Sequence, residues 1–228
     1  MTALLNRLHE GLWERNEAMT VLGMAIGHRM TVARLGDGSL WVHSPVAYSA
    51  ELAASLDALG SVAHIVAPNY VHDTYLEGWL PNYPGVRFHA PRSFHKVFPR
   101  FRITDALGET PDPSWAGLID QHAVQGAPRL HEVVFLHRPS RTLIVADLSF
   151  NLGRDMPWLS RQLCRVNGCY DHFGPSRLFR SVIRDRAALR ASIDRILGWD
   201  FDRLVVGHGA VIETGGKAAL REAFSFLA

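Results

Sequence analysis

A short β-branched run that breaks at a proline is the most informative stretch of this sequence: Ile65-Val66-Ala67-Pro68-Asn69-Tyr70-Val71-His72-Asp73-Thr74-Tyr75-Leu76-Glu77-Gly78-Trp79. Residues 62–66 predict a strand and residues 74–80 predict a helix. The loop between them carries His72 and Asp73. Loops at strand ends are where a rigid scaffold positions chemistry, so we expect this loop to contribute to a functional site.

The chain on both sides of this loop alternates strand and helix patterns, which is typical of an α/β fold. Asp37-Gly38 between two β-prone runs indicates a hairpin, and residues 99–117, rich in Pro, Gly, Asp and Thr without a period, predict a surface connection. The other predicted strands are 30–35, 40–43, 86–89, 118–124, 132–137, 142–146 and 201–206. The other predicted helices are 49–59, 93–97, 156–166, 176–197 with a break near 184–185, and 216–227.

The first segment of the chain predicts an amphipathic helix over residues 3–19. Its apolar residues fall on one helical stripe: Leu4, Leu5, Leu8, Leu12 and Trp13. We therefore expect residues 1–25 to form a helical extension of a single domain that spans residues 1–228, because no repeat, linker or low-complexity tract divides the sequence.

The composition is that of a soluble globular protein. The 228 residues are 47% hydrophobic and 20% charged, with a formal net charge of +2. This balance predicts neither a nucleic acid nor an anionic membrane as partner. The partner that we expect is a small-molecule substrate or ligand. Because no apolar run approaches the roughly 20 residues of a membrane span and no signal-peptide pattern opens the chain, we expect a cytoplasmic protein. The spacing of Cys164 and Cys169 fits neither a zinc site nor a CxxC motif.

Two later segments repeat the pattern of the opening stretch, in which a β-branched run ends and an Asp or His follows. Asp147 follows Leu143-Ile144-Val145, and His208 follows Leu204-Val205-Val206. Imidazole nitrogens and carboxylate oxygens are ligands for zinc, iron or manganese. Taken singly, Asp73 and Asp147 are equally explained as helix or turn caps, whereas His208 between two glycines is harder to explain structurally.

The order and spacing of these segments resemble the metallo-β-lactamase superfamily. Residues 142–148 are similar to its segment with a metal-bridging Asp, and residues 204–209 to its terminal Gly-His-Gly segment. The resemblance implies an α/β fold, a four-layer αββα sandwich with a metal site along one edge, here with the N-terminal helix added. The runs at residues 39–45 and 140–143 are also similar to an uncharacterised branch of that superfamily, known as a domain of unknown function.

The resemblance breaks down at the first metal-binding motif, HxHxDH. Pro68 and Tyr70 stand where its first two histidines belong, and His131 is displaced from the position of the third ligand of that metal. The positions of the second metal's ligands hold His72, Asp73, Asp147 and His208, with the Asp-His order reversed. We therefore expect at most one divalent metal (zinc, iron or manganese), or none.

The leading functional hypothesis is a metal-dependent hydrolase with at most a mononuclear site, acting on an ester, thioester, lactone or phosphoester. His72 and His208 would be nitrogen ligands, and Asp147 or Asp73 would hold the attacking water. The alternative is a catalytically inactive member that binds a small molecule or a protein. A metal-free hydrolase using His72 with Asp73 lacks a nucleophile. Four further residues remain open as members of the site: His43, Asn69, Tyr70 and His131.

Overall fold

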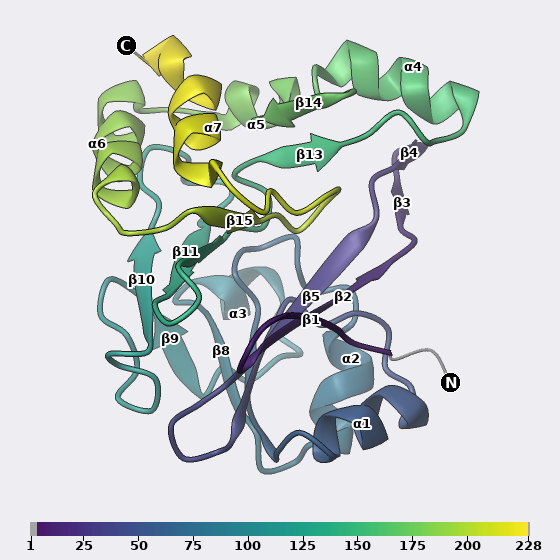
Figure 1. Cartoon of the computed structure of the whole chain (residues 1–228), viewed down its shortest axis with the longest axis vertical. Helices are drawn as coiled ribbons and strands as arrows, with labels where there is room; N and C mark the ends of the chain where they lie inside the picture. The colour runs from purple at the N-terminus through teal and green to yellow at the C-terminus, as the bar shows by residue number, and fades with distance from the viewer. Residues whose placement is uncertain (1–3, 228) are drawn as a thin grey trace.

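Two β-sheets form the centre of the protein, whose computed structural model describes residues 4–227 (Figure 1). Within that range, one sheet has the order β1-β2-β5-β6-β7-β8-β9 and the other β10-β11-β12-β15. The first sheet comprises β1 (Asn6–His9), β2 (Leu12–Glu17), β5 (His28–Arg34), β6 (Leu40–His43), β7 (Val62–Val66), β8 (Arg87–Pro91) and β9 (Asp105–Leu107). The second comprises β10 (Ile119–Ala123), β11 (Val133–His137), β12 (Thr142–Ile144) and β15 (Arg203–Val205). Two short hairpins complete the strands: β3 (Thr20–Val21) with β4 (Met24–Ala25), and β13 (Phe150–Leu152) with β14 (His172–Gly174).

The helices cover the outer faces of the two sheets. On the first sheet lie α1 (Ala50–Asp57), α2 (Leu76–Trp79) with the 3-10 turn η1 (Leu80–Asn82), and α3 (Phe94–Val97). On the second lie α5 (Arg177–Val182), α6 (Arg186–Leu197), α7 (Gly216–Ala223) and the 3-10 turn η2 (Ser225–Leu227). Helix α4 (Trp158–Asn167) packs on β4.

The alternation of side chains along the strands produces three stacked cores. In β12, Leu143 packs with α6 and α7, while Ile144 faces the other sheet. In β7, Ile65 packs with α1 and α2, while Val66 faces the second sheet. Successive residues of a strand point to opposite faces, so each sheet is buried on both sides. This is the four-layer αββα arrangement that the resemblance to the metallo-β-lactamase superfamily implied.

The predicted N-terminal helix is wrong, because this segment forms two strands. β1 and β2 are antiparallel, and β2 pairs with β5 from Leu12↔Ala33 to Glu17↔His28. Leu12 lies between the two sheets, and Trp13 lies on the helix-covered face of the first sheet. Neighbouring residues therefore point to opposite faces, as in a strand, although the same apolar residues also fit a helical stripe. Gly11, with φ at 76°, makes the turn between the strands. Pairing with a neighbouring strand has outweighed the local helical periodicity.

Most other predicted elements are confirmed within a few residues. The break predicted near 184–185 separates α5 from α6, where the Asp185 side chain caps α6 by accepting from the amide of Ala188. The predicted connection at 99–117 is wrong in part, because β9 lies within it and pairs in parallel with β8. Three residues are too few to show a period, so this strand carries no signal that can be recognised from the residues alone.

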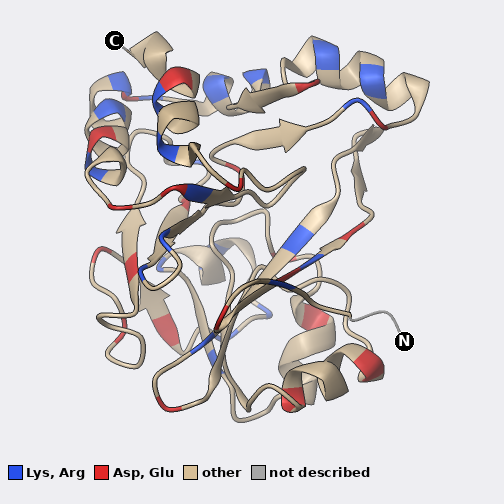
Figure 2. Cartoon of the chain, in the orientation of Figure 1, with Lys and Arg blue, Asp and Glu red and all other residues tan. Residues whose placement is uncertain are grey.

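Charge is distributed unevenly over the two helical layers (Figure 2). The charged residues of helices α4, α5 and α6 are mostly Arg, whereas those of α1 and α2 are Asp and Glu. The small net charge therefore conceals an asymmetry between opposite ends of the molecule. Among residues 4–227, no helix combines the length and the apolar character needed to cross a membrane.

Candidate functional site

Three of the four predicted ligands converge at one edge of the sandwich. Asp147 and His208 follow β12 and β15, which are parallel neighbours with Ile144 opposite Val205, so both loops leave the sheet on the same side. His72 Nε2 lies 2.9 Å from Asp147 Oδ2, and His208 Nε2 lies 3.2 Å from Asp147 Oδ1. One ligand-type atom from each residue lies within 4.8 Å of the other two.

The glycines on either side of His208 allow its loop to pack tightly against the neighbouring strands. A Cβ on Gly207 would meet the backbone oxygen of Ala146 at 3.0 Å, and one on Gly209 would meet that of Asn151 at 2.1 Å. Gly209 also has φ at 98°, in the region that favours glycine. The sequence Gly-His-Gly thus brings His208 beside Asp147 through close backbone approach.

Each imidazole is held through the ring nitrogen that does not face Asp147. His208 Nδ1 lies 2.6 Å from the carbonyl oxygen of Gly27, to which an Nδ1–H donates. His72 Nδ1 lies 2.6 Å from Ser44 Oγ, which is also 3.1 Å from His28 Nε2. A carbonyl only accepts, so the Gly27 contact fixes the hydrogen on Nδ1 of His208 and directs its Nε2 toward Asp147.

Behind Asp147 lies a buried carboxylate that sequence analysis had not singled out, Glu132. Its two oxygens accept hydrogen bonds from the amides of Ala146 and Asp147, each at 2.8 Å. The Asn69 amide donates to Asp147 Oδ2 at 2.8 Å and to Glu132 Oε2 at 3.3 Å, and so stands between the two carboxylates. Burial, together with the charge of Asp147, raises the pKa of Glu132 to about 8.

The electrostatics of the group favour a charged Asp147. Burial alone would raise the pKa of Asp147, but the facing His72 and His208 outweigh it and hold this pKa well below its usual range. Burial would likewise lower the pKa of His208, yet its hydrogen bond to Asp147 raises that pKa above the ordinary value. The site is thus a largely buried carboxylate between two buried imidazoles.

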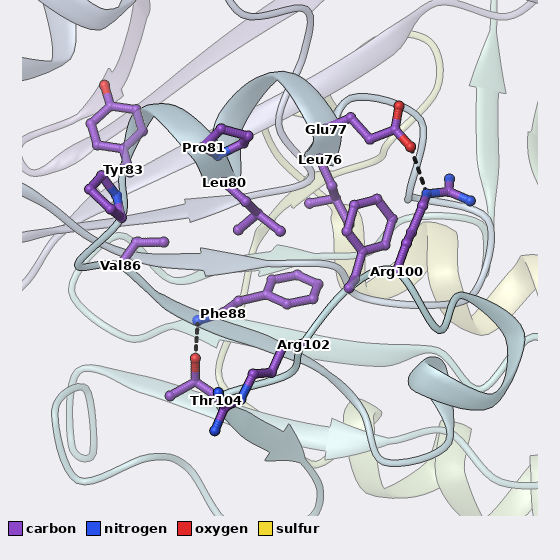
Figure 3. A pocket seen from close by; sticks show the side chains of 12 residues that line it. Leu76, Glu77, Leu80, Pro81, Tyr83, Val86, Phe88, Arg100, Arg102 and Thr104 are labelled. Atoms are coloured by element: carbon purple, nitrogen blue, oxygen red, sulfur yellow. Dashed lines mark hydrogen bonds and ion pairs between the residues drawn. The ribbon is translucent and has the colours of Figure 1, made fainter.

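Asp73 does not join this group. Its carboxylate pairs with Arg100 at 3.2 Å, and Arg100 also pairs with Glu77 at 2.7 Å. Arg100 and Glu77 line a pocket of about 460 Å³ between α2 and the segment 100–104, with Phe88 and Leu80 inside it (Figure 3). Adjacent residues of a loop point in different directions, which separates Asp73 from His72.

The residues left open by the sequence fall into different places. Asn69 belongs to the site, as described above. The ring of Tyr70 packs against that of His131, with centroids 4.7 Å apart, and neither residue is among the three converging ligands. His43 stacks on Trp41, and within the described residues neither of its ring nitrogens has a hydrogen-bond partner, so it makes no strand-end hydrogen bond. Its burial lowers its pKa well below the ordinary value.

A second His-Asp group lies on the first sheet, formed by His89, Asp105 and Asp112. The guanidinium of Arg87 pairs with both carboxylates, at 2.9 Å to Asp105 and 2.7 Å to Asp112. An arginine that neutralises both carboxylates makes this group an ion-pair network rather than a candidate metal site.

Four supporting residues escaped sequence analysis: Gly27, His28, Ser44 and Glu132. Ser44 directly follows the predicted strand 40–43, and Glu132 is the first residue of the predicted strand 132–137, so neither position marks a functional site. The one available signal was Glu132 itself, an acidic residue at the start of an apolar strand. Buried acidic residues need hydrogen-bonding partners, which here are supplied by residues 69, 146 and 147 far along the chain.

Comparison with known proteins agrees with this fold. Residues 9–167, well over half of the chain, match the family described as Domain of unknown function (DUF4336). The chain belongs to the DUF4336 family. The matched range contains His72 and Asp147, whereas His208 lies beyond it. No curated protein matches the sequence.

Solved structures of metallo-β-lactamases share the fold of this DUF4336 protein. The enzyme DIM-1 matches with a TM-score of 0.66 at 15% identity, covering 98% of this chain and 97% of its own. A metallo-β-lactamase from Hirschia baltica matches with a TM-score of 0.66 at 11% identity, covering 98% of this chain and 96% of its own. One from Erythrobacter litoralis matches with a TM-score of 0.67 at 14% identity, covering 98% of this chain and 95% of its own. At such identities the likeness concerns the fold alone.

Proposed function

We propose that this DUF4336 protein is a metal-dependent hydrolase with one divalent metal held by His72, Asp147 and His208. The observation that carries this proposal is the convergence of two Nε2 atoms on the two oxygens of one largely buried carboxylate. Two imidazoles and a carboxylate suit zinc, iron or manganese. A protein of the same fold, FIM-1 from Pseudomonas aeruginosa, is described in a mono-zinc form, at 10% identity and a TM-score of 0.62.

The surroundings of the three residues fit a metal. Imidazoles that bind metals commonly donate their other N–H to a carbonyl or another oxygen, which fixes ring orientation. The contacts of His208 Nδ1 with Gly27 O and of His72 Nδ1 with Ser44 Oγ are of this kind. Asn69 and the Glu132-bound backbone fix the carboxylate of Asp147 in turn.

The chemistry assigned to the site is hydrolysis of an ester, thioester, lactone or phosphoester. When bound, a divalent metal lowers the pKa of a water and polarises the scissile group. Asp147 would hold the attacking water in position by accepting a hydrogen bond from it. Asn69 would keep Asp147 oriented, and the nearly complete burial of His72 and His208 would keep bulk water away.

Metal titration tests the proposal without relying on activity. We expect the purified protein to take up one equivalent of zinc, iron or manganese and to gain about 2.7 kcal/mol of stability when free metal is 100 times its dissociation constant. His208→Ala should lose this metal-dependent gain, whereas the exposed control His95→Ala should keep it. Absence of metal uptake by the unaltered protein would refute a metal-dependent function.

A second candidate function is a small-molecule binding module without catalysis. It is favoured by the contacts of Asp147, whose two oxygens lie within hydrogen-bond distance of His72, His208 and Asn69. Under this alternative, His208→Ala would lower thermal stability equally with and without added metal, because no metal contributes.

A further inference from the structure

An apolar pocket of about 250 Å³ opens beside Asp147. Six of its nine lining residues are apolar, and they come from separate segments of the chain. The apolar lining comprises Val71, Leu130, Phe150, Leu178, Phe179 and Val182. Its polar members are Asp147, Ser176 and Arg129, so Arg129 is the one basic residue in the lining.

Two aliphatic side chains of this pocket remain largely in water. Val71 is 58% exposed and Leu178 is 57% exposed, while Phe179 is only 5% exposed. Exposed aliphatic residues are unremarkable when scattered, but here they border a cavity with a buried aromatic wall. Such concave, mainly apolar sites with few polar groups are typical of small-molecule binding sites.

The pocket is continuous with the proposed metal site. Asp147 lines it directly, and its side chain keeps 14% of its surface exposed. Val71 immediately precedes His72 in the chain. The ring of Phe150 lines the pocket and also stacks on His208, with centroids 5.3 Å apart and planes 11° from parallel. A molecule in the pocket therefore contacts Asp147 and the aromatic wall that supports His208.

We propose that this pocket binds the unbranched aliphatic acyl chain of a carboxylic ester or thioester and places its carbonyl at Asp147. The inference rests on the proposed function and narrows its substrate class. Hydrolysis breaks the bond from the acyl carbon to oxygen or sulfur. The water oxygen bonds to that carbon, giving the carboxylic acid, and the departing alcohol or thiol takes up the proton.

The volume of the pocket suits a chain of about eight carbons, and its mainly apolar lining favours an acyl ester over a phosphoester. A volume of 250 Å³ is that of about eight liquid water molecules, which corresponds to a chain of about eight carbons. A phosphoester brings a negatively charged group that stays charged near neutral pH. Six of the nine lining residues are apolar, and Arg129 is the one basic residue among them that could pair with that charge.

Binding to metal-free protein tests the pocket independently of catalysis. We expect the neutral probe octanamide to bind, acetamide to bind at least about 100-fold more weakly, and affinity to rise about three- to fourfold for each added methylene until the pocket is filled. Leu178→Asp should weaken octanamide binding about tenfold or more. The matched control is Leu159→Asp, because Leu159 is equally exposed, at 58%, and lies on α4 outside the pocket.

Equal affinity for octanamide and acetamide, or equal loss in the Leu178 and Leu159 variants, would overturn the pocket assignment. Esterase assays with p-nitrophenyl acetate and p-nitrophenyl octanoate on metal-loaded protein separate the two proposals. Octanamide binding that depends on Leu178, without hydrolysis of either ester, would support the pocket and refute the hydrolase. Hydrolysis without preference for the octanoate would support the hydrolase and refute the acyl pocket.

Discussion

At the scale of single residues, Asn69 is the side chain that allows two buried carboxylates to lie close together. It is fully buried and donates to both Asp147 and Glu132. Its own oxygen accepts from the amide of Val71 at 2.9 Å, which fixes the direction of its NH₂ group. An amide of the same shape as a carboxylate thus lies between the two carboxyl groups and donates to both.

Asn69→Asp should therefore destabilise the metal-free protein strongly. The substitution exchanges a donor for a third carboxylate in a buried site, so we expect a loss of about 3–5 kcal/mol near pH 7. Urea denaturation measures this loss, with the exposed Asn82→Asp as the control that should change stability little. A loss no larger than that of the control would contradict the separating role of Asn69.

The sign of the pH dependence provides a further check on this variant. Burial beside two carboxylates should raise the folded-state pKa of the new aspartate above its unfolded value. Between these two pKa values the folded state binds more protons, so the stability deficit relative to the unaltered protein should shrink as the pH falls from 7 toward 5. A deficit that grows on acidification would exclude this explanation.

At the scale of elements, the loop after β15 is joined to β13 through Gly209. Asn151 and Gly209 form a parallel β-bridge, and the amide of Ala210 donates to the Asn151 carbonyl at 2.8 Å. The His208 carbonyl in turn accepts from the amide of Asn151 at 3.1 Å. The orientation of His208 therefore depends on backbone contacts of this loop as well as on its own side chain.

Gly209→Ala should destabilise the protein by more than the cost of its backbone conformation. A Cβ there would fall 2.1 Å from the Asn151 oxygen, whereas one on Gly117, at a similar φ of 84°, would meet nothing within 4 Å. We expect Gly117→Ala to cost about 1–2 kcal/mol and Gly209→Ala clearly more. Thermal denaturation of the two variants gives the comparison, and equal losses would show that the loop can move away from β13.

At the scale of the whole molecule, buried neutral histidines connect stability to pH. Burial lowers the pKa of both His89 and His137 to about 4. His89 lies in the first sheet with its Nε2 3.0 Å from His64 Nδ1, and His137 lies in the second sheet beside Ser140. Neither belongs to the proposed metal site, so their effect is separate from metal binding.

We expect stability to fall as the pH decreases from about 6.5 to about 4. In this window the histidines bind protons in the unfolded chain but not in the folded protein. Each histidine can therefore contribute up to roughly 3 kcal/mol to the free energy of unfolding. This contribution is present above the unfolded-state pKa and is lost as the pH falls toward the folded-state pKa. His137→Phe should reduce the slope by up to one proton, about 1.4 kcal/mol per pH unit. The exposed control His95→Phe should leave the slope unchanged, and an equal change in both variants would contradict this account.

The alternation of strand and helix patterns predicted an α/β fold, and the resemblance to the metallo-β-lactamase superfamily implied the four-layer sandwich. Residues 62–66 were predicted as a strand with the bounds that β7 has. The N-terminal strands were missed, since apolar residues at 4, 5, 8, 12 and 13 satisfy a helical stripe and only the partner strand β5 selects the extended form.

The sequence by itself determined that a histidine or an aspartate ends each of three strands, because these positions are readable one segment at a time. Only the tertiary structure decided that His72, Asp147 and His208 meet while Asp73 turns to Arg100. It also supplied Ser44, Glu132 and the apolar pocket, whose members lie far apart in the chain. Local patterns record which face of an element is buried, but the direction of a loop side chain depends on partners that only folding brings near.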